Sequence, residues 1–282
     1  MTKIVRTVAC IDGSQMLYRA EFGFPARIRN RAGYDVTALF GFLALTRKAL
    51  ISSPKRPTHA VVVFDADAPT HRSTLDHRYR ATRQPLLNGS PTNPFRHLPW
   101  ILRALQAWGM ACIEHTTSEA DDVIASLISQ RGAEKDERWI VISRDKDFHQ
   151  LVSDRVTQWD PTRGGDKGWI TPSVIAERYG VHAVQWCDYV SLVGDRSDGM
   201  PGIRGVGPVT AARLLGDGRA LEDIADQFGR ADFMDALNQR ALHRLRTDVQ
   251  LTSTKSSPLP TEGLRPAAQV LEQLELWDAS YP

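Results

Sequence analysis

The sequence is poor in cysteine and in net charge, and each shortage narrows the range of proteins to which it can belong. Only three cysteines occur in 282 residues, at positions 10, 112 and 187. Their odd number, wide spacing and apolar surroundings argue against a disulfide framework and predict reduced core residues of a cytosolic protein. The net charge is only +2. Any surface that binds nucleic acid must therefore be local.

Long apolar runs and lysines are also scarce. No stretch approaches the ~20 consecutive apolar residues of a membrane span, and the N-terminus lacks the apolar core of a signal peptide. Only seven of the 35 basic residues are lysines, which leaves 28 arginines. Arginine suits bidentate contacts with phosphate, although genome composition can produce the same bias. We expect a soluble, cytoplasmic protein of one large domain, or of one domain with a smaller appendix, and no membrane partner.

Three apolar runs are each followed closely by aspartate. Residues 5–11 precede Asp12, residues 60–64 precede Asp65, and residues 139–143 precede Asp145 and Asp147. Helical patterns at residues 36–51 and 100–108 lie between them, which predicts an α/β fold with a parallel sheet. One aspartate after one strand is more often a turn or helix cap. Because ligands bind outside the carboxyl ends of parallel strands, the repeated placement favours a common site.

A further acidic group opens a predicted helix at Glu119, Asp121 and Asp122. Carboxylates gathered within a few ångströms repel one another and require protons or cations between them. Oxygen ligands without His or Cys favour Mg²⁺ or Mn²⁺ over zinc. Taken alone, the group is more often ordinary capping, since Ser118 approximates a capping box and the helix dipole favours acidic residues there.

Residues 71–83 (HRSTLDHRYRATR) are strongly basic and contain Arg72, Arg78, Tyr79, Arg80 and Arg83. Proline and small polar residues follow, which predicts a mobile excursion outside the core. Arginines with an interleaved aromatic suit a nucleic-acid backbone and a stacked base. A solvated helix face has the same composition, and composition alone does not separate the two.

The second informative stretch is GDRSDGMPGIRGVGPVTAARLL at residues 194–215. It adds two carboxylates, Asp195 and Asp198, and a glycine series at Gly202, Gly205 and Gly207 that precedes a helix beginning at a proline. Glycines allow backbone amides to approach a phosphate at a helix N-terminus, although tight turns also need glycine. Residues 172–192 and 220–249 are predicted to be helical, with a short last element at 270–277.

These stretches together resemble the 5′-nuclease family, which comprises flap endonucleases, phage 5′-3′ exonucleases and the N-terminal domain of bacterial DNA polymerase I. The matching pieces, in order, are CIDGSQMLYRA, VFDA, YRATR, SEADDVIASL, ISRDKDFHQLV and GDRSDGMPGIRGVGPVTAARLL. No polymerase domain follows, so a free-standing bacterial member is expected. The resemblance implies a PIN-like α/β fold of the flap-endonuclease type: a mostly parallel sheet flanked by helices, with a helical arch and a helix-two-turn-helix module. The expected division is a nuclease core at 1–183 with the arch at about 66–99, the DNA-binding module at 184–255, and a tail at 256–282 that packs on the core.

The resemblance also implies roles for individual residues. One metal ion would be held by Asp12, Asp65, Glu119 and Asp121, and a second by Asp121, Asp145, Asp147 and Asp195, with Asp122 and Asp198 in support. Arg80 and Arg83 would clamp the scissile phosphate. DNA contacts are expected from Arg19, Arg72, Arg78, Tyr79, Arg80, Arg83, Gly202, Gly205 and Gly207. The glycine-containing module would carry K⁺.

The implied activity is hydrolysis of DNA phosphodiesters by a two-metal mechanism with Mg²⁺ or Mn²⁺. It would act as 5′-flap endonuclease and 5′-3′ exonuclease in replication and repair, as a monomer, on DNA with 5′ flaps, overhangs, nicks or gaps. A branched-DNA-binding protein with little or no cleavage is the alternative, which an incomplete acidic set would favour. A topoisomerase-primase-type Mg²⁺ enzyme would not predict Asp65. Two positions depart from the family pattern: Arg80 stands where many relatives have Lys, and Gly199 where Asn is common.

Overall fold

A seven-stranded sheet forms the centre of the molecule. The computed structural model describes residues 6–65, 72, 93–131, 137–163, 165–260 and 262–279. The strands are β1 (Arg6–Asp12), β2 (His59–Phe64), β3 (Ala111–Glu114), β4 (Glu137–Ile142), β5 (Val156–Trp159), β6 (Trp169–Ile170) and β7 (Ser257–Pro258). Their order is β3-β2-β1-β4-β5-β6, with β7 paired to β2. The five strands β3, β2, β1, β4 and β5 run parallel to one another. Strand β6 pairs antiparallel with β5, and β7 pairs antiparallel with β2.

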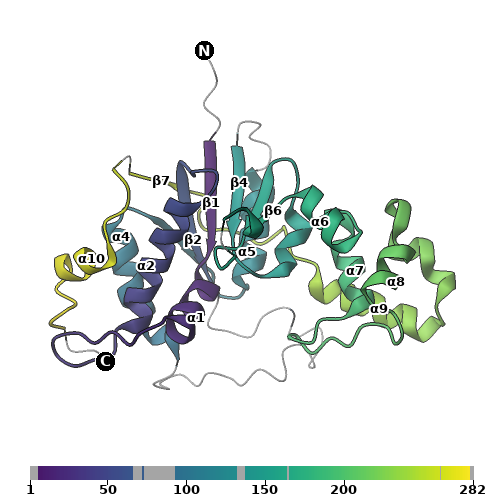
Figure 1. Cartoon of the computed structure of the whole chain (residues 1–282), viewed down its shortest axis with the longest axis horizontal. Coiled ribbons are helices and arrows are strands. Elements are labelled where there is room, and N and C mark those ends of the chain that lie inside the picture. Colours follow the sequence, from purple (N-terminus) through teal and green to yellow (C-terminus); the bar gives the residue numbers. More distant parts are fainter. Residues whose placement is uncertain are drawn as a thin grey trace, which may run out of the picture.

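Helices cover both faces of the sheet (Figure 1). They are α1 (Gly13–Gly23), α2 (Thr37–Ser52), α4 (Leu98–Ala107), α5 (Ala120–Arg131), α6 (Pro172–Tyr179), α7 (Trp186–Val193), α8 (Pro208–Leu214), α9 (Arg230–His243) and α10 (Ala267–Gln273). Short 3-10 helices are η1 (Pro94–His97), η2 (Lys146–Leu151), η3 (Gly165–Gly168), η4 (Ala183–Gln185), η5 (Gly216–Gly218) and η6 (Leu221–Gln227).

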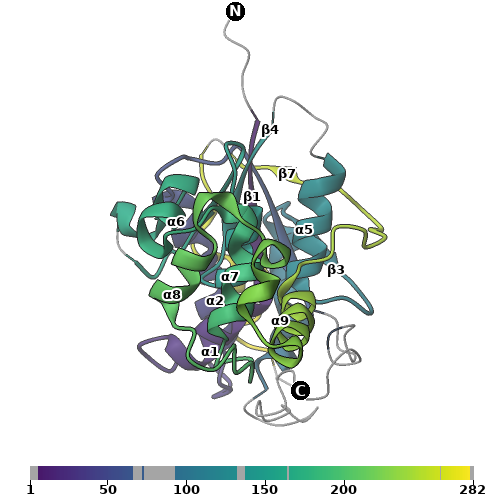
Figure 2. The same cartoon turned by 90° about the vertical axis from the view of Figure 1, so that its right-hand side faces the viewer.

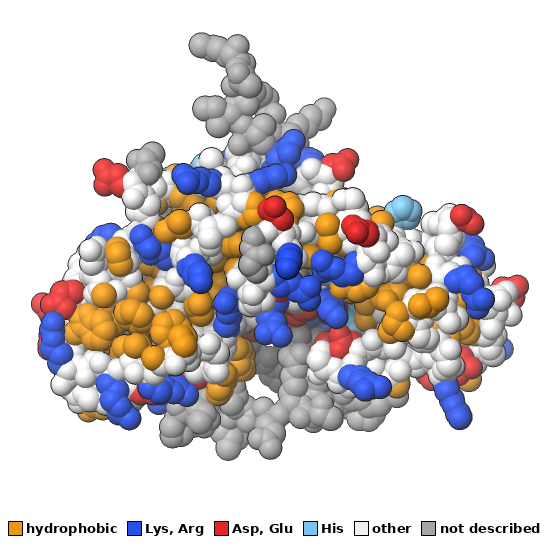
Figure 3. Space-filling model, in the orientation of Figure 1, with side chains coloured by type: hydrophobic (Ala, Val, Ile, Leu, Met, Phe, Trp, Pro, Cys, Tyr) orange, Lys and Arg blue, Asp and Glu red, His pale blue; other side chains and the backbone are white. Residues whose placement is uncertain are grey.

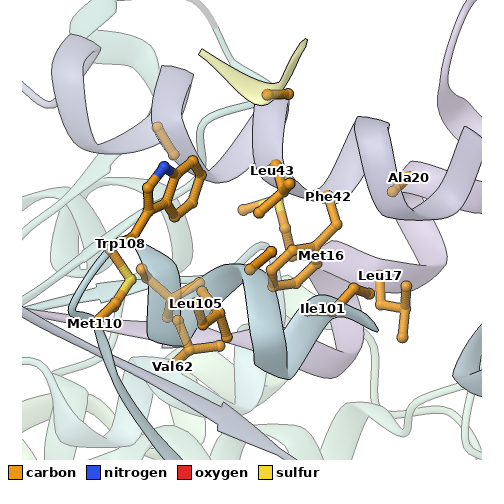
Figure 4. Packing of buried hydrophobic residues seen from close by; sticks show 14 of the residues in the cluster. Met16, Leu17, Ala20, Phe42, Leu43, Val62, Ile101, Leu105, Trp108 and Met110 are labelled. Atoms are coloured by element: carbon orange, nitrogen blue, oxygen red, sulfur yellow. The ribbon is translucent and has the colours of Figure 1, made fainter. Parts of the chain in front are cut away.

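The strand residues alternate between two hydrophobic clusters, because successive side chains of a strand point to opposite faces. Ala9 and Ile11 of β1 join the cluster formed with α1, α2, α4 and α10. Val8 and Cys10 join the cluster formed with α5. Figure 4 shows the first cluster, where Phe42 of α2 and Ile101 of α4 pack above Val62 of β2. Burial on both faces explains why these strands read as continuous apolar runs.

A second module, made of α6 to α9, packs beside the sheet and has its own core (Figure 2). Trp186, Leu192 and Leu221 are almost completely buried in it. The sequence pattern predicted one helix over residues 172–192, and this is wrong in detail. Gly180 takes the left-handed conformation at φ 70° and ends α6, so the chain re-enters helix only at Ala183.

The turn after α7 requires glycine at two facing positions. Gly194 and Gly202 have φ of 85° and 69°. A Cβ atom built on Gly202 would lie 2.5 Å from the backbone nitrogen of Gly194. Gly202 is therefore fixed by close backbone packing, whereas Gly205 and Gly207 leave open space around their Cα atoms.

The C-terminal segment lies against the first face of the sheet. Strand β7 pairs with the start of β2, and Val270 and Leu271 of α10 are buried in the cluster with α2 and α4. No helix in the described part of the chain is long and apolar enough to cross a membrane.

Candidate metal centre at the carboxyl edge of the sheet

Six carboxylates line a single pocket of about 570 Å³ at the carboxyl ends of the central strands. This acidic pocket contains Asp12, Asp65, Glu119, Asp121, Asp145 and Asp195. Asp12 ends β1 and caps α1, Asp65 follows β2, and Asp145 follows β4. Parallel strands end at the same edge, so three segments distant in sequence deliver their aspartates to one place. The sequence predicted this convergence from the repeated strand-aspartate pattern.

Ser143 connects the carboxylate of Asp12 to the backbone of Asp145. Its hydroxyl donates to Asp12 Oδ2 over 3.0 Å and accepts from the backbone N–H of Asp145 over 3.1 Å. The other oxygen of Asp12 accepts from the N–H of Gln15 at the start of α1, over 2.9 Å. Asp12 is thus held in one orientation by groups from β4 and α1.

Asp65 joins β2 to the acidic start of α5. Its Oδ1 accepts the N–H of Ala120 over 2.7 Å, and its own N–H donates to Ser14 Oγ over 2.8 Å. A carboxylate at this position satisfies a free amide of the first helical turn and is favoured by the helix dipole. Asp65 therefore caps the first turn of α5 and also lines the acidic pocket.

The turn after β4 is fixed by a side chain from β5. Gln158 Nε2 donates to the carbonyl oxygens of Ser143 and Asp145 over 2.9 and 2.6 Å. Asp145 Oδ1 accepts the N–H of Asp147 over 3.0 Å, which starts η2. Asp145 consequently faces the acidic pocket, while Asp147 is 6% exposed and points into the protein.

Arg72 lies inside the acidic cluster rather than on an open basic surface. Its guanidinium donates to Glu119 Oε2 over 2.8 Å, to both oxygens of Asp121 over 3.1 Å and to Asp122 Oδ1 over 2.7 Å. The side chain is only 2% exposed. The sequence grouped Arg72 with the DNA-contacting arginines. The structure corrects its placement, because the residue serves as a buried counter-ion for three carboxylates.

His243 is a site residue that the sequence did not reveal. Its ring is completely buried, and Nδ1 lies 3.4 Å from Asp147 Oδ1. Gln150 fixes it there, since Nε2 of Gln150 donates to the carbonyl oxygens of both Asp147 and His243. The eight histidines show no metal-binding spacing in the sequence, so only the contact between η2 and the end of α9 brings this imidazole to the cluster.

Burial and mutual repulsion shift the pKa values of the cluster. Burial raises the pKa of Asp12 to about 8, and the charge of Asp65 adds to the effect. Burial raises the pKa of Asp122 and of Asp145 to about 7, assisted by Asp121 and Asp147 respectively. The pKa of Asp195 behaves differently. Burial raises it, but hydrogen bonds from Ser197 outweigh this and hold the pKa below its usual value.

The donor set fits hard divalent cations, because every ligand in the acidic pocket is a carboxylate oxygen. No group of three or more Asp, Glu, His or Cys side chains among the described residues is arranged to hold an ion as it stands. In this arrangement the guanidinium of Arg72 pairs with Glu119, Asp121 and Asp122. A cation at these three carboxylates would compete with Arg72 for their oxygens.

We expect the metal-free protein to lose stability as the pH rises from about 6 to about 8. Asp12, Asp122 and Asp145 have folded-state pKa values of about 7 to 8, against about 3.9 in an unfolded chain. The folded state therefore binds more protons between about pH 4 and about pH 8, and stability falls through this window as pH rises. Each group contributes at most about 1.4 kcal/mol per pH unit.

Thermal unfolding with a chelator at the two pH values measures this effect. Asp12→Asn should be more stable than the wild type at the higher pH and should show a weaker pH dependence. Asp278→Asn is the matched control, because Asp278 is 62% exposed at the opposite end of the chain. Equal pH dependence in the wild type and Asp12→Asn would show that Asp12 ionises normally.

Basic and aromatic side chains surround the acidic pocket. Arg144 and Lys146 are exposed at its rim, and Tyr18 of α1 lines it while remaining 40% exposed. In Figure 3 basic side chains gather at the middle of the face, next to a hollow where acidic side chains are visible. Arg19 is half-buried on the same helix as Tyr18. The predicted residues Arg78, Tyr79, Arg80 and Arg83 lie outside the described residues.

The remaining predicted residues fall into two groups. Asp122, Asp147 and Asp198 are buried behind the acidic pocket, at 2%, 6% and 5% exposure. Gly205 and Gly207 are exposed in the loop before α8, and Gly207 is the residue preceding that helix. Tyr18 was not predicted as a site residue, because an aromatic residue in an amphipathic helix is usually part of the core.

Two family models match the chain. The 5′-3′ exonuclease N-terminal resolvase-like domain matches residues 7–180, and the 5′-3′ exonuclease C-terminal SAM fold matches residues 181–262. The thermostable DNA polymerase I of Thermus thermophilus is 34% identical in an alignment of 282 positions, which covers 95% of this chain and 32% of that protein. DNA polymerase I of Mycobacterium tuberculosis is 32% identical over 260 residues, 88% of this chain and 28% of that protein. The chain spans about a third of the length of these relatives.

Solved structures share the fold. The T5 D15 protein co-crystallized with metal ions gives a TM-score of 0.62 at 17% identity, covering 84% of this chain and 86% of that chain. The catalytic core of Rad2 in complex with DNA substrate gives a TM-score of 0.57 at 15% identity, covering 97% and 88%. The α/β fold predicted from the sequence is confirmed by these matches.

Proposed function

Because the chain belongs to the 5′-3′ exonuclease family, we propose that it is a structure-specific 5′ nuclease that hydrolyses DNA phosphodiester bonds. It acts as a 5′-flap endonuclease and as a 5′-3′ exonuclease, on DNA with 5′ flaps, overhangs, nicks or gaps. The observation that carries this proposal is the acidic pocket, in which six carboxylates meet at one edge of the sheet beneath a basic rim.

The proposed metal ligands are divided between two ions in the way that the family resemblance implies. Asp12, Asp65, Glu119 and Asp121 hold one ion, and Asp121, Asp145, Asp147 and Asp195 hold the other. Two bound divalent ions would lower the pKa of water and stabilise negative charge on the phosphate oxygens. The all-oxygen donor set supports Mg²⁺ or Mn²⁺. A T5 5′-exonuclease structure, similar in fold, contains bound divalent metal ions, which are zinc in that case.

The chain's own residues hold this site in place. Ser143 orients the carboxylate of Asp12 and holds the backbone N–H of Asp145, and Gln158 fixes the carbonyls of the turn that carries Asp145. His243 lies against Asp147 and is held by Gln150. Burial raises the pKa of Asp12 and Asp145, so ion binding must release protons and tightens as pH rises.

DNA would lie across the face that carries the acidic pocket. Arg144 and Lys146 can contact phosphates at its rim, and the exposed ring of Tyr18 can stack on a base beside the carboxylates. The open backbone of Gly205 and Gly207 before α8 supports a contact with the duplex backbone and, in the same loop, a K⁺ ion. Structures of Rad2 similar in fold contain DNA substrate. We propose that the protein acts as a monomer in the cytoplasm, the latter supported by its three free cysteines.

A branched-DNA-binding protein with little cleavage is the second candidate. It is favoured by one observation: the buried Arg72 pairs with three of the nine carboxylates. In that reading the guanidinium replaces the cations permanently, and the acidic pocket is a structural feature.

We expect a 5′-flap DNA, labelled at its 5′ end, to release a short oligonucleotide with Mg²⁺ or Mn²⁺ and nothing with a chelator. The reason is that only bound cations make the acidic pocket attractive to a phosphodiester. Gel separation of the products measures this outcome. Mononucleotides alone would indicate action from the end, while tight binding without any product would favour the second candidate.

A further inference from the structure

A second cavity, of about 440 Å³, opens on the other side of the acidic cluster. We call it the basic pocket. Its polar lining comes from Arg72, Asp122, Arg240, Arg244, Arg246 and Thr247. Four arginines and one carboxylate give it an excess of positive charge, in contrast to the acidic pocket. Nothing in the two-metal reaction requires this cavity.

A thin wall separates the two pockets. Glu119 and Asp121 line the acidic pocket, whereas the next residue of α5, Asp122, lines the basic pocket. Arg72 completes the wall, because its guanidinium contacts all three carboxylates. The two pockets are therefore adjacent across this part of α5.

The backbone of the basic pocket is held rigidly against α5. The N–H of Arg246 donates to Asp122 Oδ1 over 2.8 Å, and the carbonyl of Arg246 accepts from Ser126 Oγ over 3.1 Å. The same hydroxyl accepts the N–H of Val249 over 3.0 Å. The segment that carries the arginines therefore does not need to be ordered by a ligand.

The available charge in the basic pocket belongs to Arg244 and Arg246. Arg240 is already neutralised by Asp188 and Glu222, at 3.1 and 2.5 Å. Among the residues that the structure describes, the Arg246 side chain pairs with Asp248, and this solvent-exposed pair is weak. Arg244 is exposed, and no ion pair is recorded for it among the described residues. Guanidinium groups presented in this way bind phosphate by paired hydrogen bonds.

We propose that the basic pocket binds a backbone phosphate of the single-stranded 5′ segment beyond the scissile phosphate, with Arg244 as its main contact. This inference rests on the proposed nuclease function. The duplex side is assigned to the opposite pocket, because the exposed residues Tyr18, Arg144 and Lys146 line only the acidic one. The apolar side chains of Leu237 and Leu245 also line the basic pocket and suit a sugar or base next to that phosphate.

The test compares Arg244→Ala with the wild type on two DNAs that share one duplex, one with a 5′ flap of several nucleotides and one blunt. Binding is measured by fluorescence anisotropy with a chelator, so that no cleavage intervenes. We expect Arg244→Ala to weaken flap binding about 10-fold, the loss of one charge-assisted hydrogen bond, and to leave blunt DNA unchanged. Arg230→Ala, an exposed arginine at the other end of α9, is the matched control. Thermal unfolding of Arg244→Ala should equal that of the wild type.

A second measurement identifies the phosphate. Single methylphosphonates, which remove one phosphate charge, are placed along the flap. One position should weaken binding to the wild type and have no further effect on Arg244→Ala, because both changes remove the same contact. Additive losses at every position, an equal loss on blunt DNA, or unchanged flap binding would each overturn the proposal.

Two outcomes distinguish a failure of the proposed function from a failure of the role given to the basic pocket. If the wild type neither binds nor cleaves flap DNA, the proposed function and the basic pocket are both rejected. If the wild type cleaves flap DNA but Arg244→Ala binds it equally well, only the role of the basic pocket is rejected.

Discussion

Replacing Asp145 by asparagine will abolish DNA cleavage while leaving DNA binding intact or tighter. Asp145 faces the acidic pocket and is proposed to hold the second metal ion. Its loss removes a ligand and several kcal/mol of transition-state stabilisation, which corresponds to a rate decrease on the order of 10³-fold or more. One negative charge also disappears beside the DNA phosphates, so repulsion falls. Single-turnover cleavage and equilibrium binding of a 5′-flap DNA, measured side by side, separate the two effects.

Asparagine keeps the geometry of the turn after β4, because its amide oxygen can still accept the N–H of Asp147. Asp278→Asn is the control for the charge change, since that carboxylate lies far from the site and is 62% exposed. Cleavage by Asp145→Asn at the wild-type rate would reject the metal assignment. Loss of cleavage together with loss of binding would instead indicate that the site has collapsed.

Replacing Arg72 by alanine will destabilise the metal-free protein by about 3–5 kcal/mol. The guanidinium is 2% exposed and pairs with Glu119, Asp121 and Asp122. Without it three buried carboxylates lose their counter-ion, and breaking a buried ion pair from one side leaves uncompensated charge. Urea unfolding with a chelator measures the loss, which should be smaller at about pH 6 than at about pH 8, because protons can then replace the arginine.

Divalent cations should restore more stability to Arg72→Ala than to the wild type. In the wild type a cation competes with Arg72 for Glu119 and Asp121, whereas the variant has no guanidinium at this position. Unfolding with and without Mg²⁺ or Mn²⁺ tests this difference, with Arg230→Ala as the control for removal of an exposed arginine. A small loss in the chelator would mean that Arg72 is not the principal counter-ion.

Helix capping and a place in the acidic pocket are combined in one acidic residue. Asp65 caps the first turn of α5 and also lines the acidic pocket. The distinction between a helix cap and a metal ligand, which composition does not make, is therefore not exclusive at this position.

Several elements were predictable because their signals are local. The apolar runs of β1, β2 and β4 and the periodic patterns of α2 and α4 appear in the structure within a few residues of their expected positions. The strands β3, β5, β6 and β7 were not predicted. They are two to four residues long, and so short a strand is defined by its pairing with a neighbour rather than by its own propensity.

The sequence by itself determined that carboxylates gather at one edge of the sheet, because parallel strands that each end in aspartate must deliver them to the same side. Only the tertiary structure decided which cationic groups meet them. Arg72 reaches residues 47 to 50 positions away along the chain, and His243 reaches Asp147 across the end of α9. The local sequence of residues 71–83 does not show that Arg72 is buried, because its burial depends on long-range packing. The basic pocket has the same origin, since α5, α9 and Arg72 form it only when they are folded together.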